Sequence, residues 1–330
     1  MSKNSPLCRK HALALWPLIT VLILSLLAGC GTTPANPPAT ANNAQDSSAA
    51  VQTTYPLKVT DDFQHEVSIP AQPKRIVSLV PAVTETLYAL GIGDSVVGVT
   101  KFDDYPQEAQ QKAEYVFDDS LKPNTEQILK LNPDLIILGM QDEKTVTAIQ
   151  NLKIPVVQFN PQTLSSTYDT LLKIGQITNK QNETQKMVSA MQQKEKDIEQ
   201  KVAGIKDSDR PKVWVEVDPN LFTAGEGTFL NELITKAGGK NIAGDVQDWA
   251  QYSAEQVIAK NPQVIFNTYS YYIPNVKETI LARPTWQNID AVKNKRVVDL
   301  DSDMVTRPGP RIVDGMESIA KALYPDLSDD

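Results

Sequence analysis

The sequence predicts an α/β protein of two similar lobes with parallel-type sheets, joined by one long α-helix. The first observation is a repeat: residues 124–137 and 253–266 share a helix cap, a short amphipathic helix, an Asn-Pro stop and a buried strand. The second is that apolar strands alternate with helices in both halves, which favours parallel sheets covered on both faces. The third is one long polar helical stretch between the halves. Two equivalent halves make the cleft between them the first place to look for a site.

Residues 1–30 are predicted to be a targeting segment and not part of the fold. A basic head precedes an apolar stretch and a few small residues that end at Cys30. Residues 27–30, Leu-Ala-Gly-Cys, resemble a bacterial lipobox, in which the cysteine is acylated and becomes the mature N-terminus. An uncleaved anchor helix is the alternative, which Pro17 and the short apolar run disfavour. Both interpretations place the protein outside the cytoplasm, at the outer face of the bacterial cell membrane.

The composition of the remaining chain excludes several classes of function. Residues 31–54 are mostly Ala, Thr, Pro, Asn, Gln and Ser, so they are predicted to be a disordered tether. Cys8 lies in the targeting segment and Cys30 in the lipobox, which leaves no thiol for a disulfide, a metal site or a nucleophile. The net charge of −8 becomes −11 once the three basic residues of the first 30 are removed, so no nucleic-acid partner is expected.

The N-terminal lobe is predicted over residues 55–165. Its apolar runs have the length of strands and are bounded by Gly, Pro or Asn, while the segments between them have helical spacing. The first copy of the repeat supplies one helix and the strand that follows it. The expected strands are 75–80, 95–100, 135–138 and 154–159, and the other expected helices are 84–90 and 145–152.

Residues 166–206 are predicted to be connecting helices, and residues 207–330 a second lobe that repeats the order of the first. The long helix over 181–205 would span about 36 Å at 1.5 Å per residue, which is the size of a domain. A stiff bridge of this kind allows rocking by small angles more readily than wide hinge opening. The expected strands of the second lobe are 212–217, 264–268 and 296–300, and its expected helices besides the repeat are 228–237 and 311–324.

Signals for catalysis or bare metal capture are weak. The segment Gly93-Asp94-Ser95 resembles the Gly-Asp-Ser of a lipase-like hydrolase family, but no histidine follows residue 65 and a serine without a base is inert. A turn between a helix and a strand explains the segment as well. His65 is the one histidine after the targeting segment, whereas bare zinc or manganese sites use several. We expect no catalytic residue, no resident metal and no intrinsic cofactor; a surface-anchored hydrolase stays open as the enzyme alternative.

Aromatic and polar residues gather where strands end or helices begin, which is where open α/β sheets bind ligands. Flat rings suit a large, planar, partly apolar ligand, which a few polar groups then orient. Part of the set is expected to pack in the core or on the surface instead. The predicted ligand-binding residues are Pro81, Phe102, Asp104, Tyr105, Phe222, Trp249, Tyr252, Tyr269, Met304 and Arg307.

Glu126 and Glu255 occupy the same place in the two copies of the repeat, and two explanations fit them. Asn124 and Ser253 are good N-caps, and a glutamine three residues on would close a capping box in each copy. A glutamate in the first turn is favoured by the helix dipole alone, by about 0.3–1 kcal/mol. The functional explanation is that the two carboxylates dock the two lobes onto a two-fold partner. The residues by themselves leave both explanations open.

An ordered series of motifs resembles the vitamin B12-binding and ferric-siderophore-binding subunits of ABC importers, over nearly all of residues 57–325. Both copies of the repeat belong to this series. The other matching segments are Val77-Ser-Leu-Val-Pro81, Thr84-Glu85-x-Leu87, Val97-Gly-Val, Asp104-Tyr105-Pro106, Phe222-Thr-Ala-Gly225, and Asp301-Ser-Asp303 through Pro310-Arg311.

The resemblance implies the class III periplasmic-binding-protein fold, in which two α/β lobes joined by a long helix hold the ligand between them. It also implies that Glu126 and Glu255 contact arginines on the membrane permease dimer, since that family has one such glutamate in each lobe. Charged pairs of this kind mainly steer and orient docking. We therefore expect a monomeric, lipid-anchored protein that delivers a metal chelate to an ABC importer.

The identity of the chelate is less constrained than the class. Phe102, Phe222 and Trp249 fall at positions similar to the lining aromatics of the B12-binding member, which favours a corrinoid. Ser120 and Met304, in contrast, stand where that member has aromatic residues. Arg307 and Arg311 would suit an acidic siderophore or the propionates of haem, so a ferric siderophore or haem is the alternative. A non-transport adhesion or sensor domain is a further alternative of a different class.

Overall fold

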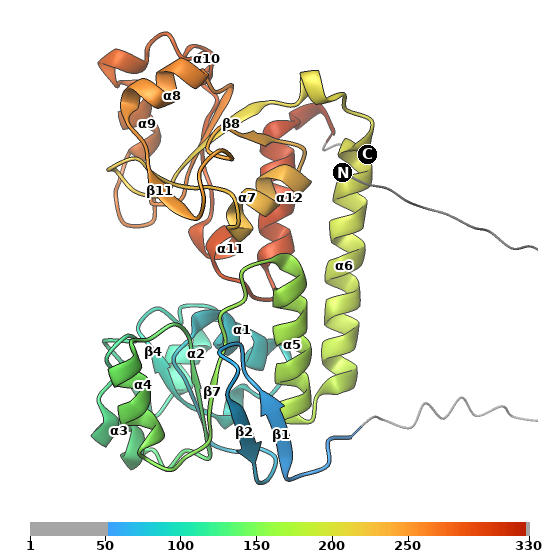
Figure 1. The fold of residues 1–330 in the computed structure, drawn as a ribbon, viewed down its shortest axis with the longest axis vertical. Coiled ribbons are helices and arrows are strands. Elements are labelled where there is room, and N and C mark those ends of the chain that lie inside the picture. Colours follow the sequence, from blue (N-terminus) through green and yellow to red (C-terminus); the bar gives the residue numbers. More distant parts are fainter. Residues whose placement is uncertain (1–51, 328–330) are drawn as a thin grey trace, which may run out of the picture. The chain divides into compact units, whose positions relative to one another are not determined.

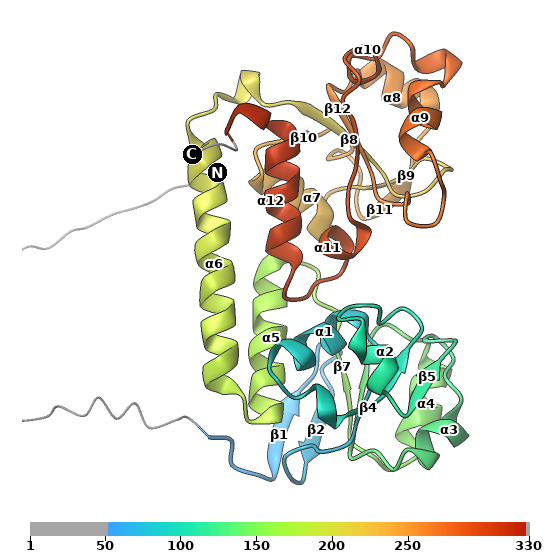
Figure 2. The same ribbon diagram turned by 180° about the vertical axis from the view of Figure 1, so that it is seen from behind.

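The computed structural model describes residues 52–327 of the chain, so Cys30 and most of the predicted tether lie outside the described residues. Within residues 52–327 no helix is both long enough and apolar enough to cross a membrane. The described chain forms two α/β lobes, shown in blue to green and in yellow to red in Figure 1 and from behind in Figure 2. The predicted fold class is confirmed.

The N-terminal lobe is built on a five-stranded parallel sheet in the order β5-β4-β3-β6-β7. The strands of this sheet are β3 (Ile76–Ser78), β4 (Val96–Thr100), β5 (Tyr115–Phe117), β6 (Leu135–Leu138) and β7 (Val156–Gln158). An antiparallel hairpin, which the sequence analysis missed, precedes the sheet; it consists of β1 (Leu57–Thr60) and β2 (Glu66–Ile69). Its four-residue strands alternate buried and exposed residues, a pattern too short to stand out in the sequence.

Helices cover both faces of this sheet, as alternating side chains require. Ile76 and Ile137 point to the face that α1 and α5 cover, while Val77 and Ile136 point to the face that α3 and α4 cover. The bounds are α1 (Pro81–Ala89), α2 (Glu108–Lys112), α3 (Thr125–Lys130), α4 (Glu143–Gln150) and α5 (Leu164–Thr178). A 3-10 turn, η1 (Gly93–Ser95), joins α1 to β4, so the Gly-Asp-Ser segment is a turn as expected.

The long helix α6 (Gln181–Ala203) carries the chain from one lobe to the other. It packs antiparallel to α5 after a turn at Asn179, which caps α5 in the left-handed conformation at φ 59°. The two helices approach closely at Gly175, where an added Cβ would lie 2.2 Å from Thr184 Oγ1. Further along, the Tyr168 hydroxyl donates to Glu195 at 2.5 Å. The predicted long helix is therefore present, with α5 packed along its first part and α12 along its second part.

The C-terminal lobe contains a four-stranded parallel sheet in the order β10-β8-β12-β13 and a separate two-stranded antiparallel ribbon, β11-β9. The strands are β8 (Lys212–Glu216), β9 (Phe222–Ala224), β10 (Lys240–Asn241), β11 (Trp249–Gln251), β12 (Val264–Asn267) and β13 (Val297–Asp299). The helices are α7 (Phe229–Lys236), α8 (Ala254–Lys260), α9 (Val276–Leu281), α10 (Asp290–Lys293), α11 (Ser302–Thr306) and α12 (Ile312–Leu323). Short connections η2 (Asp207–Asp209), η3 (Pro284–Trp286) and η4 (Pro325–Leu327) complete the lobe.

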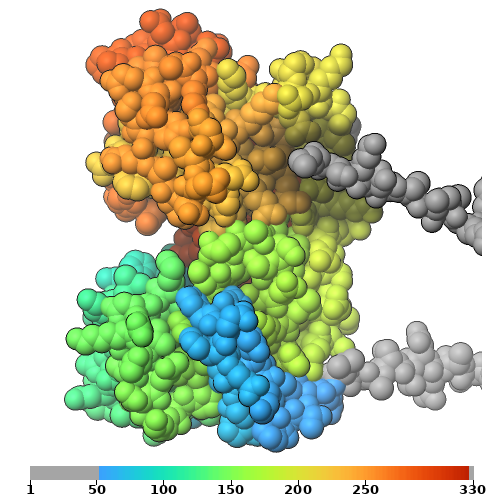
Figure 3. Space-filling view, viewed as in Figure 1, coloured from blue at the N-terminus to red at the C-terminus, as the bar shows by residue number. Residues whose placement is uncertain are grey.

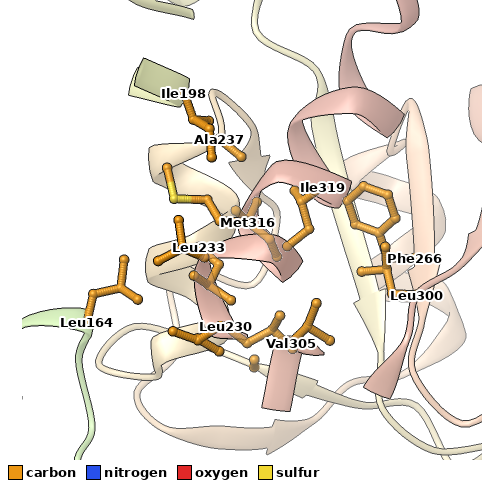
Figure 4. Packing of buried hydrophobic residues seen from close by; sticks show 14 of the residues in the cluster. Leu164, Ile198, Leu230, Leu233, Ala237, Phe266, Leu300, Val305, Met316 and Ile319 are labelled. Atoms are coloured by element: carbon orange, nitrogen blue, oxygen red, sulfur yellow. The ribbon is translucent and has the colours of Figure 1, made fainter. Parts of the chain in front are cut away.

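The main core of the C-terminal lobe also holds the connecting helices. Leu233 of α7 and Met316 of α12 are fully buried against each other's helices, with Ile198 of α6 at the edge (Figure 4). Leu164, at the start of α5, joins this same core, while Ile177 at the other end of α5 joins the core of the N-terminal lobe. Helix α5 is thus packed into both lobes. Burying apolar surface at both of its ends stabilises one arrangement of the lobes, by roughly 25 cal/mol per Å².

The two copies of the repeat fold alike. Helix α3 leads to β6 and helix α8 leads to β12, and both strands lie beside the first strand of their sheet, β3 and β8. Asn132 and Asn261 stop the helices with φ of 44° and 47°, in the left-handed region that asparagine tolerates. Ser253 and Gln256 form the predicted capping box. In the first copy the Asn124 side chain instead accepts from two backbone N–H groups, those of Glu126 and Gln127.

Candidate functional site

The N-terminal lobe presents aromatic rings on the turn that follows β4. Asp103 anchors this turn from inside: its carboxylate is fully buried and accepts from the backbone N–H of Thr100 at 2.8 Å and from the Thr100 hydroxyl. Burial raises the pKa of Asp103, and the hydrogen bonds from Thr100 oppose that shift. With Asp103 turned inward, Phe102 and Tyr105 are about half exposed and Asp104 is exposed. The structure therefore places three of the predicted residues together on one exposed turn.

The C-terminal lobe presents aromatic rings on the β9–β11 ribbon. Phe222 pairs with Gln251 across the ribbon, two residues along from Trp249, which pairs with Ala224. Both rings are exposed, and Trp249 also makes an edge contact with Phe229 at 6.4 Å between ring centroids. In both views the ribbon lies on the side of its lobe that faces the N-terminal lobe (Figures 1 and 2). The space-filling view shows a furrow between these two parts of the molecule (Figure 3).

Two predicted lining residues, Tyr252 and Tyr269, are wrong as lining residues because the structure buries both rings. Tyr252 packs on Trp214 at 5.3 Å and donates its hydroxyl to Asp245 at 2.5 Å. Tyr269 donates to buried Glu216 at 2.5 Å, and burial raises the pKa of its phenol. Tyr252 packs on a residue 38 positions earlier, Trp214, and Tyr269 bonds Glu216, 53 positions earlier, so spacing along the sequence did not separate them from lining rings.

Tyr271 and Tyr272 are exposed in the loop where the sequence analysis singled out Tyr269. Their rings meet edge to face at 4.8 Å, and Tyr272 also lies 6.2 Å from Tyr269. They were part of the same Tyr-Ser-Tyr-Tyr segment, so the signal was present in the sequence. The structure buries Tyr269 and exposes Tyr271 and Tyr272.

Arg307 and Arg311 lie at the junction of the lobes, where carboxylates surround them. Arg307 lies 2.7 Å from Asp104, 2.8 Å from Asp303 and 3.3 Å from Glu85. Arg311 forms a two-pronged pair with Glu85, at 2.8 Å for each bond, and its guanidinium lies 3.8 Å from the centre of the Tyr105 ring. Glu85 and Asp104 belong to the N-terminal lobe and the arginines to the C-terminal lobe. The predicted ligand contact Arg307 is therefore an inter-lobe ion pair.

Pro81 and Met304 occupy supporting positions near this junction. Pro81 is the first residue of α1, where proline is favoured because its missing N–H needs no partner. Met304 is half-buried in α11, and its carbonyl carbon and oxygen lie where a side chain on Gly315 of α12 would have to go. The loop after α11 also touches α1, since an added Cβ on Gly309 would lie 3.2 Å from that of Ala82. These contacts fix the backbone that carries the two arginines.

Glu126 and Glu255 are exposed at the second position of α3 and α8. Backbone hydrogen bonding at the helix start and the Ser253 side chain lower the pKa of Glu255. Both glutamates are therefore equivalent, solvated charges on equivalent helix starts. Their docking role stays a prediction.

The described residues contain no group of three or more His, Cys, Asp or Glu side chains arranged to hold a metal ion. His65 is exposed and its ring lies 3.2 Å from Asp61. A surface hollow of about 600 Å³ lies elsewhere, between α6 and α12, and Lys194, Glu317 and Lys321 on its wall pair with one another. The aromatic faces of the two lobes remain the arrangement with chemistry suited to a large planar ligand.

Comparison with known proteins identifies the family of this chain. The periplasmic binding protein family matches residues 76–304. An ABC transporter substrate-binding lipoprotein of Bacillus subtilis, YvrC, is 36% identical over 96% of this chain and 98% of its own. Among solved structures, a possible iron-binding periplasmic solute-binding protein of Staphylococcus epidermidis is 33% identical with a TM-score of 0.68, over 77% of this chain and all of that one.

The vitamin B12-binding protein BtuF of Vibrio cholerae is 27% identical with a TM-score of 0.66, over 79% of this chain and all of that one. The family match over residues 76–304 includes parts of both lobes, the long helix and both copies of the repeat. The chain belongs to the periplasmic binding protein family.

Proposed function

We propose that this protein is the lipid-anchored substrate-binding component of an ABC importer and captures a metal chelate, preferably a corrinoid, between its two lobes. The single observation that carries the proposal is the pair of exposed aromatic surfaces on facing parts of the lobes. Phe102 and Tyr105 come from one lobe, and Phe222 and Trp249 from the other. A flat ligand placed between them would stack on both and would lose most of its contact with water.

The proposed delivery step uses Glu126 and Glu255. Each is an exposed carboxylate at the second position of a helix, in elements that the repeat makes equivalent. A permease with two-fold symmetry offers the same basic patch twice, which suits a protein with the same acidic point on each lobe. The lipid on Cys30 would hold the protein at the outer face of the membrane, as a monomer tethered near the permease.

A ligand challenge tests the capture step. We would express residues 31–330 without Cys30, add cyanocobalamin, remove free ligand by desalting and record the visible spectrum of the protein peak. One corrinoid per chain is the expected result. Trp249→Ala should weaken binding by about 2 kcal/mol, or roughly thirtyfold, because it removes one stacking wall. Phe63→Ala, an exposed aromatic in the β1–β2 loop, is the matched control and should bind normally.

An uptake assay tests the delivery step separately. The double variant Glu126→Ala/Glu255→Ala should lose uptake of labelled cyanocobalamin in cells while the purified protein keeps its affinity. Glu143→Ala/Glu278→Ala removes two exposed carboxylates from the first turns of α4 and α9 and should leave uptake intact. Loss of uptake in both variants would argue against a specific docking role. Normal uptake in the first variant would contradict the docking role of Glu126 and Glu255.

A ferric siderophore or haem is the second candidate ligand. Its support is the similarity to the Staphylococcus epidermidis protein described as possibly iron-binding, which is more identical to this chain than the B12-binding protein is. A protein peak without corrinoid absorbance, followed by saturable binding of a ferric siderophore or haem, would establish this alternative.

A further inference from the structure

We infer that the site between the lobes takes a ligand that carries no net negative charge, and that Glu85 and Asp104 set this preference. The inference rests on the proposed function, because it concerns the charge of the ligand bound there. Its starting point is that the two arginines expected to receive acidic groups of a ligand are already engaged by the protein's own carboxylates.

Arg307 has its charge shared among three carboxylates. Asp104 lies 2.7 Å from it across the lobe junction, Asp303 lies 2.8 Å away on its own helix, and Glu85 lies 3.3 Å away. The side chain of Arg307 is only 16% exposed. A ligand carboxylate would have to displace one of these partners and would leave it close to the others as an unpaired negative charge.

Arg311 is held by Glu85 through two hydrogen bonds. Both of its bonds to Glu85 are 2.8 Å long, and Glu85 is almost completely buried. A bidentate arginine–carboxylate pair has two parallel N–H···O hydrogen bonds, which is the strongest geometry for this kind of pair. The Tyr105 ring covers one face of the same guanidinium, with 3.8 Å between Arg311 Cζ and the ring centre. Arg311 therefore supports Tyr105, and its positive charge is already balanced by the carboxylate of Glu85.

The segments that carry the exposed aromatic rings are themselves poor in basic residues. Residues 217–227 and 246–252, around Phe222 and Trp249, contain three acidic residues and no lysine or arginine. The turn at residues 100–107 exposes one lysine and one aspartate, Lys101 and Asp104, because Asp103 is buried, and the Lys101 ammonium lies 5.2 Å from the centre of the Phe102 ring. The surface offered to a flat ligand is therefore apolar with an excess of carboxylates. Like charges juxtaposed at an interface disfavour the wrong partner.

The ligand class that fits is a flat chelate with neutral or cationic side groups, such as a corrinoid whose periphery carries amides. Chelates with free carboxylates, including haem and ferric citrate, are disfavoured. Amides can accept from and donate to the exposed polar groups without displacing Glu85 or Asp104.

Two nearly isosteric probes test the inference. Cyanocobalamin is compared with a cobalamin monocarboxylate, in which one peripheral amide is hydrolysed, by titration of tryptophan fluorescence at fixed ionic strength. Haemin and ferric citrate complete the panel. In the unmodified protein the neutral corrinoid should bind about tenfold more tightly than its monocarboxylate. Asp104→Asn and Glu85→Gln should narrow this ratio, because each removes one negative charge that competes with a ligand carboxylate for an arginine.

Asp94→Asn is the matched control, since Asp94 is an exposed carboxylate in the η1 turn and should leave the ratio unchanged. Asp104 is exposed as well, so Asp104→Asn keeps the test valid if Glu85→Gln fails to fold. Equal or tighter binding of the monocarboxylate or of haemin by the unmodified protein would overturn the inference and leave the proposed function standing. A ratio that neither variant changes would also overturn it. Failure of every probe to bind would overturn the proposed function and this inference with it.

Discussion

Two glutamates, Glu216 and Glu85, are buried and paired with arginine in the same two-pronged way, yet they do different things. Glu216 lies at the end of β8 and binds Arg283 at 2.6 and 2.8 Å, with further hydrogen bonds from Tyr269 and Trp214. All four residues belong to the C-terminal lobe. Glu85 lies in α1 of the N-terminal lobe and binds Arg311 and Arg307 of the other lobe.

The same kind of ion pair stabilises one lobe when both partners belong to it, and holds the angle between the lobes when the partners belong to different lobes. Glu216 ties a central strand to the loop after α9, and Arg283 is held on its other side by the Trp286 ring at 4.4 Å. Every partner of Glu216 moves with its lobe. Glu85 instead joins two bodies that a single helix connects, so its pairs hold one angle between the lobes. Removing each should therefore have different consequences.

The largest effect is expected from Glu216→Gln, which leaves Arg283 without its charged partner inside the lobe. Breaking a buried pair by removing one partner costs about 3–5 kcal/mol of unfolding free energy. Urea unfolding followed by tryptophan fluorescence measures it. The double variant Glu216→Gln/Arg283→Met removes both charges and should be less destabilised than the single one. Equal losses in the two would contradict the idea that an unpaired charge is the cause.

A smaller loss, about 2 kcal/mol, is expected from Glu85→Gln, because Arg307 keeps Asp104 and Asp303 as partners and Arg311 keeps the face of the Tyr105 ring. Its distinguishing effect should be local: amide hydrogen exchange should speed up at residues 307–311 and in the first turn of α1, while β8 and β12 stay protected. Glu216→Gln should give the reverse pattern, with faster exchange in the C-terminal sheet. Faster amide exchange throughout the protein in both variants would contradict the proposed difference between the Glu85 and Glu216 ion pairs.

The smallest effect concerns pH and Asp303, which faces Arg307 at the same junction. Desolvation raises the pKa of Asp303 to about 6, and the attraction of Arg307 only partly opposes it. The folded protein therefore holds this proton more tightly than the unfolded chain, so the unfolding free energy should fall as pH rises from about 4 to about 6. The side chain is 30% exposed, so we expect a difference of only about 1 kcal/mol relative to Asp303→Asn.

Thermal unfolding of both proteins between pH 4 and pH 7 measures that difference. Parallel curves over this range would contradict the assignment of the proton to Asp303. An unfolding free energy that rises with pH over this range would mean that the attraction of Arg307 outweighs desolvation. The pKa of Asp303 would then be lowered in the folded protein.

The repeat was the most informative feature of the sequence, and its predictions were confirmed where they depended on neighbours along the chain. The stops at Asn132 and Asn261, the strands β6 and β12 that follow them and the long helix all follow from local spacing and from residues suited to caps and turns. The hairpin β1–β2 and the ribbon β9–β11 were missed. Their strands are three or four residues long and make sense only when paired.

The sequence by itself determined the two-lobe α/β architecture, the positions of the repeat helices and of the long helix, and the equivalence of Glu126 and Glu255, because these depend on periodicity and capping within a few residues. Only the tertiary structure decided which rings are exposed and which charges are free. Tyr269 can be buried because its hydroxyl donates a hydrogen bond to Glu216, 53 residues earlier. Arg311 is committed because Glu85, 226 residues away, lies against it. These contacts form between segments that are distant in the sequence, so residue spacing along the chain does not predict them.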